Sequence, residues 1–101
     1  MDPHDLPPIV EGLTLTLRKP VKFADQEYAV LNLREPTAGE LARAMKEGGE
    51  LDMMIALIHL VAAVPRGVAE RISQRDLGEC SRFFGQFSRE QLSASAPSSP
   101  T

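Results

Sequence analysis

The sequence predicts an α+β fold, with an N-terminal β-hairpin followed by a small bundle of three or so α-helices. Three observations support this class. Apolar and polar residues alternate from residue 13, as in a strand with one buried face. After residue 37 the apolar residues recur at helical spacing instead. The chain has 101 residues, which is enough for one hydrophobic core and too few for two.

The predicted domain spans residues 13–92 and is flanked by two segments of different composition. Residues 1–12 form an acidic, proline-containing arm with little periodicity, which we expect to be flexible or loosely docked. Residues 93–101 contain no charge and no large apolar side chain, so we expect a disordered tail. The chain therefore offers one folded unit, and its function must come from the surfaces of that unit.

Two strands are predicted at the start of the domain. In the first, leucines alternate with polar residues and form one buried face: Leu13, Leu15 and Leu17. Pro20 indicates that this strand lies at a sheet edge or ends there. A polar turn over residues 24–27 leads into a second strand over residues 28–34, in which Leu31 and Leu33 share one face. A two-stranded hairpin is marginal in water, so helices must cover its apolar face.

A short helix is predicted to begin at Ala38, directly after a capping box. Pro36 ends the strand ladder, and Thr37 stands three residues before Glu40. In a capping box the threonine hydroxyl accepts the N–H of Glu40, and the glutamate carboxylate accepts the N–H of Thr37. The glycine pair 48–49 ends the helix. Its inward-facing residues are expected to be Leu41, Ala44 and Met45.

The next helix is predicted over residues 50–64 and is apolar over more than one face. One stripe at helical spacing comprises Leu51, Met54, Ile55, Ile58, Val61 and Ala62. A second stripe beside it comprises Met53, Leu57, Leu60 and Val64. A small domain has little surface to cover both stripes, so the second is a candidate contact with a partner or another copy of the chain. Alternatively this is the central, fully surrounded helix of the core, and the pattern does not separate the two.

The rest of the domain is predicted to contain a helical turn or loop over residues 65–72 and a helix over residues 74–87. Ser73 and Asp76 imitate a second capping box, with an acid that is shorter than the preferred glutamate. The apolar residues of this helix fall within one arc: Leu77, Cys80, Phe83, Phe84 and Phe87. We therefore expect an amphipathic helix that packs by an aromatic stripe.

The sequence contains no residue set that predicts catalysis, a cofactor or a metal site, so we expect a protein that is not an enzyme. Cys80 lies on the apolar arc, where a thiol is a small buried side chain with a raised pKa. His59 is expected to be a partly exposed residue at a helix edge. The net charge of −3 disfavours binding to nucleic acid. No apolar segment is long enough to cross a membrane, and a single cysteine fits the cytoplasm.

The stretch from residue 33 to residue 41 carries a resemblance to a known family. Its strongest matches are Leu33, Arg34, Glu35, Pro36, Thr37, Gly39 and Leu41. A weaker second block is formed by Asp76 and Leu77. In order and spacing these blocks are similar to the small tail assembly chaperones of contractile-tailed phages and prophages, of the type found in phages Mu and P2. The resemblance covers roughly residues 10–88 and leaves out most of the arm and the tail.

The resemblance implies an assembly factor of the host cytoplasm that binds the tape measure protein while the tail tube polymerises around it. The tail tube protein is a second candidate partner, and self-association into a homo-oligomer is also open. Two other functions remain open from the sequence. One is a minor tail or connector protein that stays in the virion, and the other is a general protein-interaction module.

Overall fold

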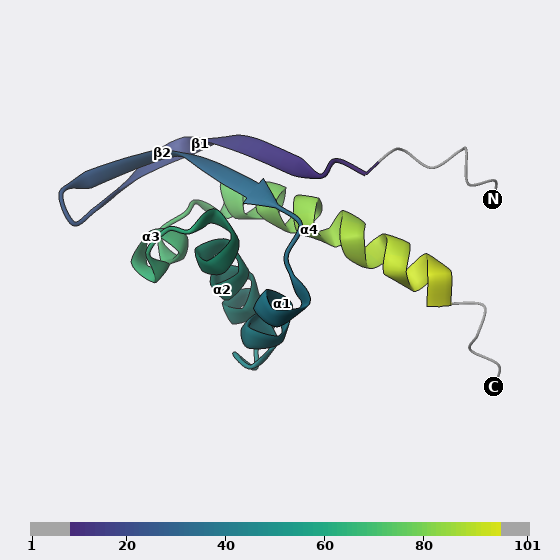
Figure 1. Ribbon diagram of the computed structural model, residues 1–101. Coiled ribbons are helices and arrows are strands. Elements are labelled where there is room, and N and C mark those ends of the chain that lie inside the picture. The colour runs from purple at the N-terminus through teal and green to yellow at the C-terminus, as the bar shows by residue number, and fades with distance from the viewer. Residues whose placement is uncertain (1–8, 96–101) are drawn as a thin grey trace.

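The computed structural model describes the backbone of residues 9–95 and the side chains of residues 9–87. In this part of the chain a β-hairpin precedes a small group of helices, which confirms the predicted α+β fold (Figure 1). The antiparallel strands are β1 (Gly12–Phe23) and β2 (Gln26–Arg34). The helices are α1 (Ala38–Met45), α2 (Glu50–Ala62), α3 (Arg66–Glu70) and α4 (Gln74–Ser95). The hairpin forms one layer, and the helices cover one of its faces.

The hairpin closes through a tighter turn than the sequence predicts. Phe23 pairs with Gln26, so only Ala24 and Asp25 form the loop, with φ angles of 52° and 64°. Positive φ at both central residues gives a backbone twist that matches the twist of the flanking strands. Gln26 and Glu27 of the predicted turn over residues 24–27 therefore belong to β2.

The pairing of β1 with β2 is interrupted in the middle of β1. Regular pairing stops at Thr16 and resumes at Val21, and residues 17–20 lie opposite Ala29 alone. Extra residues in one strand bend it and leave their backbone groups without partners in the ladder. The interruption accommodates Pro20, which has no N–H to donate. β1 lies at an edge of the sheet, as the proline indicated, but it continues beyond this residue.

The core lies between the inner face of the hairpin and the helices. The inward leucines of the strands are those that the alternation predicts: Leu17, Leu31 and Leu33 are buried, and Leu13 and Leu15 are partly buried. The aromatic stripe of α4 also packs as expected. Phe83 meets Phe84 and Phe87 edge to face, with ring centroids 5.5 and 5.3 Å apart.

α3 fixes the turn end of the hairpin to the helices. Gly67 lies so close to the ring of Phe23 that a β-carbon at this position would collide with it. The Arg71 guanidinium lies over the same ring, 5.0 Å from its centroid. The segment over residues 65–72, expected to be a helical turn or a loop, is therefore a short helix that packs against β1.

The prediction that Leu41 and Met45 face inward from α1 is wrong. These side chains are 40% and 63% exposed, and Ala44 alone of the expected set is buried. α1 packs mainly against α2, and the small Ala44 side chain lets the two helices approach closely. The larger side chains of α1 remain outside this contact.

Two helix ends also differ from the predicted ones. α2 ends at Ala62, because Ala63 adopts a left-handed conformation with a φ of 56°. α4 continues past Phe87 to Ser95 and so enters the segment predicted as a disordered tail. The rest of that tail, residues 96–101, lies outside the described residues.

The end of the N-terminal arm is attached to α4. The Gln86 side chain accepts the N–H of Val10 at 3.0 Å and donates to the carbonyl of Val10 at 2.7 Å. Residues 1–8 of the arm, which we predict to be flexible or loosely docked, lie outside the described residues.

Candidate functional site

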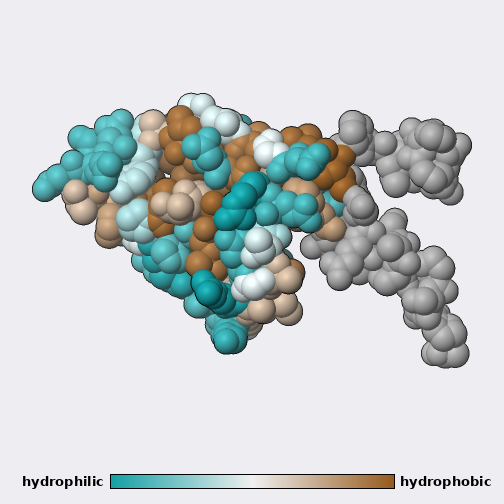
Figure 2. Space-filling view, in the orientation of Figure 1, coloured by the Kyte–Doolittle hydropathy of each residue, from teal (hydrophilic) through white to brown (hydrophobic). Residues whose placement is uncertain are grey.

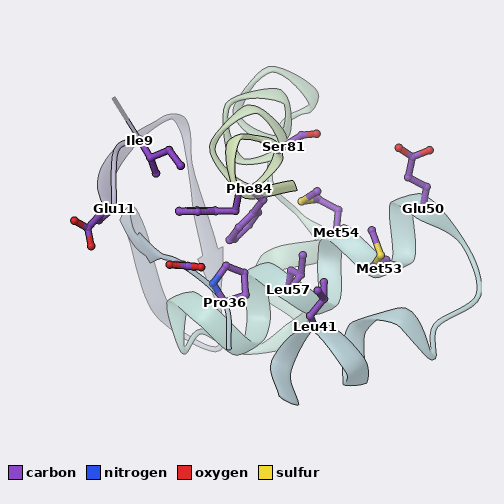
Figure 3. A pocket seen from close by; sticks show the side chains of 13 residues that line it. Ile9, Glu11, Pro36, Leu41, Glu50, Met53, Met54, Leu57, Ser81 and Phe84 are labelled. Atoms are coloured by element: carbon purple, nitrogen blue, oxygen red, sulfur yellow. The ribbon is translucent and has the colours of Figure 1, made fainter. Parts of the chain in front are cut away.

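An open groove of about 750 Å³ lies between α1, α2, α4 and the segment that precedes β1 (Figure 3). Its apolar lining residues are Ile9, Pro36, Leu41, Met53, Met54, Leu57, Phe84 and Phe87. Figure 3 shows Pro36, Leu57 and Phe84 meeting at its middle, each from a different part of the fold. The groove thus joins residues that are far apart in the sequence.

The groove walls remain accessible to solvent, unlike the core beneath them. Leu57 and Phe84 form the buried floor, at 3% and 6% exposed, whereas Met53 and Met54 are only partly buried. Outside the groove the same end of α2 exposes Leu51 by 58%. Figure 2 shows hydrophilic surface at the turn end of the hairpin and apolar surface towards the opposite end. An apolar groove that stays open to solvent is a candidate contact site for another molecule.

The polar residues around the groove carry one sign of charge. Glu11, Glu35 and Glu50 line it, and no lysine or arginine does among the described residues. All three glutamates are exposed. Figure 3 shows Glu11 and Glu50 at opposite ends of the groove. Low-dielectric walls between charges of one sign strengthen the field there, so this groove favours a cationic ligand.

The structure separates the four residues of the second apolar stripe of α2. Leu57 and Val64 lie in the core, at 3% and 9% exposed, as the reading of α2 as a central helix expects. Met53 and Leu60 are partly buried. Only Met53 and Leu57 line the groove. Exposure therefore changes along the length of α2 and not between two stripes, since the hairpin and α3 contact it in addition to α1.

Sequence reasoning missed the groove residues that lie outside that stripe. The sequence predicts that Leu41 faces inward and that Phe84 packs within the aromatic stripe of α4, and it places Met54 in the first apolar stripe of residues 50–64. Apolar periodicity gives the facing direction of a residue but not whether a neighbour covers it. The acidic border comes from three separate segments, so no local pattern in the sequence marks it.

The N-terminus of α1 has the geometry of a capping box. The Thr37 hydroxyl accepts the N–H of Glu40 at 3.1 Å, and the Glu40 carboxylate accepts the N–H of Thr37 at 2.9 Å. Arg34 donates to both oxygens of the same carboxylate, at 2.8 and 2.7 Å. The Arg34 guanidinium, followed by the N–H of Thr37, lowers the pKa of Glu40 to about 2. This network joins the end of β2 to the start of α1.

At the N-terminus of α4 only half of the predicted capping box forms. The Ser73 hydroxyl accepts the N–H of Asp76 at 3.3 Å and donates to its carboxylate at 3.0 Å. The carboxylate does not accept the backbone N–H of Ser73, which is the second bond of a capping box. It accepts the N–H of Arg18 at 3.1 and 2.9 Å and that of Lys19 at 3.4 Å. These N–H groups belong to the interrupted part of β1, so Asp76 replaces the missing strand partner.

Asp76 is fully buried in this arrangement. Burial by itself would raise the pKa of Asp76, but the hydrogen bonds that the carboxylate accepts outweigh it, first the one from the N–H of Arg18. The pKa therefore lies below its ordinary value. The Arg18 guanidinium adds a longer contact, 3.9 Å from the carboxylate.

Cys80 and His59 are the two side chains that sequence reasoning considers for catalysis. Both have structural roles. Cys80 is fully buried, and this burial raises the pKa of its thiol to about 12, so it is not a nucleophile near neutral pH. His59 is partly buried and lies 2.6 Å from the carbonyl of Val64 through Nδ1. A carbonyl only accepts, so Nδ1 carries a proton and the ring holds the chain just after α2.

Comparison with known proteins identifies the family. No helix among residues 9–95 combines the length and apolar character that crossing a membrane requires. No curated protein and no solved structure matches the chain significantly. A family model described as "Phage tail assembly chaperone proteins, E, or 41 or 14" matches residues 14–89, which include the hairpin from Thr14 onwards, α1, α2, α3 and most of α4. This chain belongs to the phage tail assembly chaperone family.

Proposed function

We propose that this chaperone binds the tape measure protein of its phage during tail assembly, through the groove between α1, α2 and α4. The observation that supports this most is an apolar groove that helices surround and that stays open to solvent. A tail assembly chaperone has to keep its client able to assemble. A groove of this kind suits the apolar face of a client helix.

The proposal narrows the partner contact to the first half of α2 and its neighbours. Met53 and Leu57 of the predicted contact line the groove, and Leu41 and Met54 join them. Methionine side chains are flexible and polarizable, so they adapt to different apolar surfaces of a client. Leu60 lies outside the groove lining and is not included in this contact.

Co-expression with the tape measure protein tests the proposal. We expect the two proteins to purify together and to associate at micromolar concentrations in titration calorimetry. The variant Met54→Asp places a charge in the groove wall and is expected to weaken the association at least tenfold. Val30→Asp is the matched control, because Val30 is 43% exposed and does not line the groove.

Two results would contradict binding of the tape measure protein by an assembly chaperone, and a third would contradict the groove as the site. One is the absence of association with the unmodified chain at micromolar concentrations. The other is abundant peptides of this chain in purified virions, which would indicate a structural tail protein. Equal weakening by Met54→Asp and Val30→Asp would place the contact elsewhere on the molecule.

A further inference from the structure

We infer that the groove selects an amphipathic client helix whose apolar stripe has lysine or arginine residues at both ends. This inference rests on the proposed function, since it describes the segment that the same groove binds. It follows from the shape of the groove, from its charge and from the exclusion of a second copy of the chain.

The shape of the groove fits a helix better than an extended strand. Its side walls come from α1, α2 and α4, and the remaining lining comes from residues just before β1 and just after β2. An added strand needs an open ladder of backbone groups to pair with, and the lining residues of the groove lie outside both strands. A helix needs only apolar walls that its side chains can fill, and Met53 with Met54 provides adaptable ones.

The charge of the groove selects the ends of the client helix. Glu11 and Glu50 lie at opposite ends of the groove (Figure 3), and Glu35, which also lines the groove, directly precedes Pro36. Among the side chains of residues 9–87, none of these glutamates lies within an ion-pair distance of a basic group. They are therefore available to cationic side chains of a partner, at both ends of one apolar surface.

A second copy of this chain is disfavoured as the occupant. A symmetric dimer formed through the groove would place the same surface on both sides of the contact. The glutamates of one copy would then face those of the other, and like charges across an interface oppose association. The net charge of −3 adds to this repulsion.

Two designed helical peptides test the inference without the natural client. Both carry the same leucine and methionine stripe over about five helical turns. One has lysine pairs at both ends, and the other has glutamate pairs. Titration calorimetry of the full chain in 50 mM NaCl is expected to show at least tenfold tighter binding of the lysine peptide. The preference should shrink severalfold in 500 mM NaCl, because salt screens exposed charges.

Charge-reversed variants of the chain locate the effect. Glu11→Lys and Glu35→Lys are each expected to reduce the preference for the lysine peptide at least threefold. Glu27→Lys is the matched control, because Glu27 is an exposed glutamate at the turn end of β2, outside the groove. None of the three residues lies in a helix, and unchanged circular dichroism confirms that each variant folds.

The outcomes distinguish this inference from the proposed function. Equal affinity for the two peptides, or equal effects of Glu35→Lys and Glu27→Lys, would overturn the inference. If the tape measure protein binds and neither peptide does, the proposed function stands and the inference fails. If the lysine peptide binds and the tape measure protein does not, the charge selection stands and the proposed function fails.

Discussion

The N-termini of α1 and α4 begin from similar sequences and use their acids differently. At α1, Glu40 caps its own helix at Thr37 and binds Arg34, and its side chain is only partly buried. At α4, the Ser73 hydroxyl likewise accepts the N–H of Asp76. The Asp76 carboxylate, however, is buried and accepts a backbone N–H of β1. Asp is one methylene shorter than Glu, which suits it less to the return bond of a capping box. Similar motifs thus stabilise the start of one helix at α1 and join a helix to a distant strand at α4.

Replacement of Asp76 by alanine is expected to have the largest effect. It removes the acceptor of two backbone N–H groups in a part-buried site, and unsatisfied buried donors are costly. We expect a loss of about 3 kcal/mol in the free energy of unfolding. Urea denaturation followed by circular dichroism measures it. Asp76→Asn keeps one acceptor oxygen and should lose less. A loss below 1 kcal/mol for the alanine variant would contradict the role given to Asp76.

Exchanging the two acids sharpens the comparison. Asp76→Glu adds a methylene to a fully buried site and is expected to cost about 2 kcal/mol, as overpacking does. Glu40→Asp shortens a cap that is only partly buried and should cost less than about 1 kcal/mol. The same denaturation measurement serves for both. If the costs are equal, side-chain length does not explain the difference between the caps.

Thr37→Ala removes the hydroxyl that caps α1 and should cost about 1 kcal/mol. Because Thr37 does not line the groove, we expect binding of the tape measure protein to remain unchanged where the variant is folded. Thermal unfolding and titration calorimetry measure the two properties separately. A loss of binding without a loss of stability would show that this joint contacts the client.

Acid is expected to weaken both caps, because folding lowers the pKa of both carboxylates. A carboxylate whose pKa is lowered by folding stabilises the fold above its unfolded pKa and loses this contribution as the pH falls towards its folded pKa. For Glu40 that window runs from about 4.5 down to about 2. Glu40→Gln should flatten the dependence of stability on pH between about 4.5 and about 2, and Asp76→Asn should flatten it below about 3.8, the ordinary pKa of an aspartate. A pH dependence that neither variant flattens would contradict the contribution of these two carboxylates to stability.

The sequence predicts those features that are set by neighbouring residues. The inward leucines of the hairpin follow from a period of two, and the box at Thr37 and Glu40 spans three residues. The exposure of Leu41 depends on whether a neighbouring helix covers it. The periodicity of the sequence does not carry this information. The bond from Asp76 to Arg18 joins residues 58 positions apart, so the local pattern suggested an ordinary cap instead.

The candidate groove was predictable in part for the same reason. The surplus of apolar residues on α2 predicts a partner contact that includes Met53, and Met53 lines the groove. The predicted contact also includes Val64, which the surrounding elements bury. The number of apolar residues on α2 indicates that some of them remain exposed. Which end of α2 is exposed depends on how the hairpin and the other helices pack against it.

The bond between Asp76 and β1 also sets an order for folding during synthesis. The ribosome makes Arg18 and Lys19 early, and the carboxylate that satisfies them emerges only after β2, α1, α2 and α3. Until then the bend in β1 has unpaired backbone groups, and Leu17 and Val21 lack the α4 residues that help cover β1. Completion of this fold is therefore a late event in translation, because a nascent chain that stops before Asp76 lacks the acceptor for the N–H groups of Arg18 and Lys19.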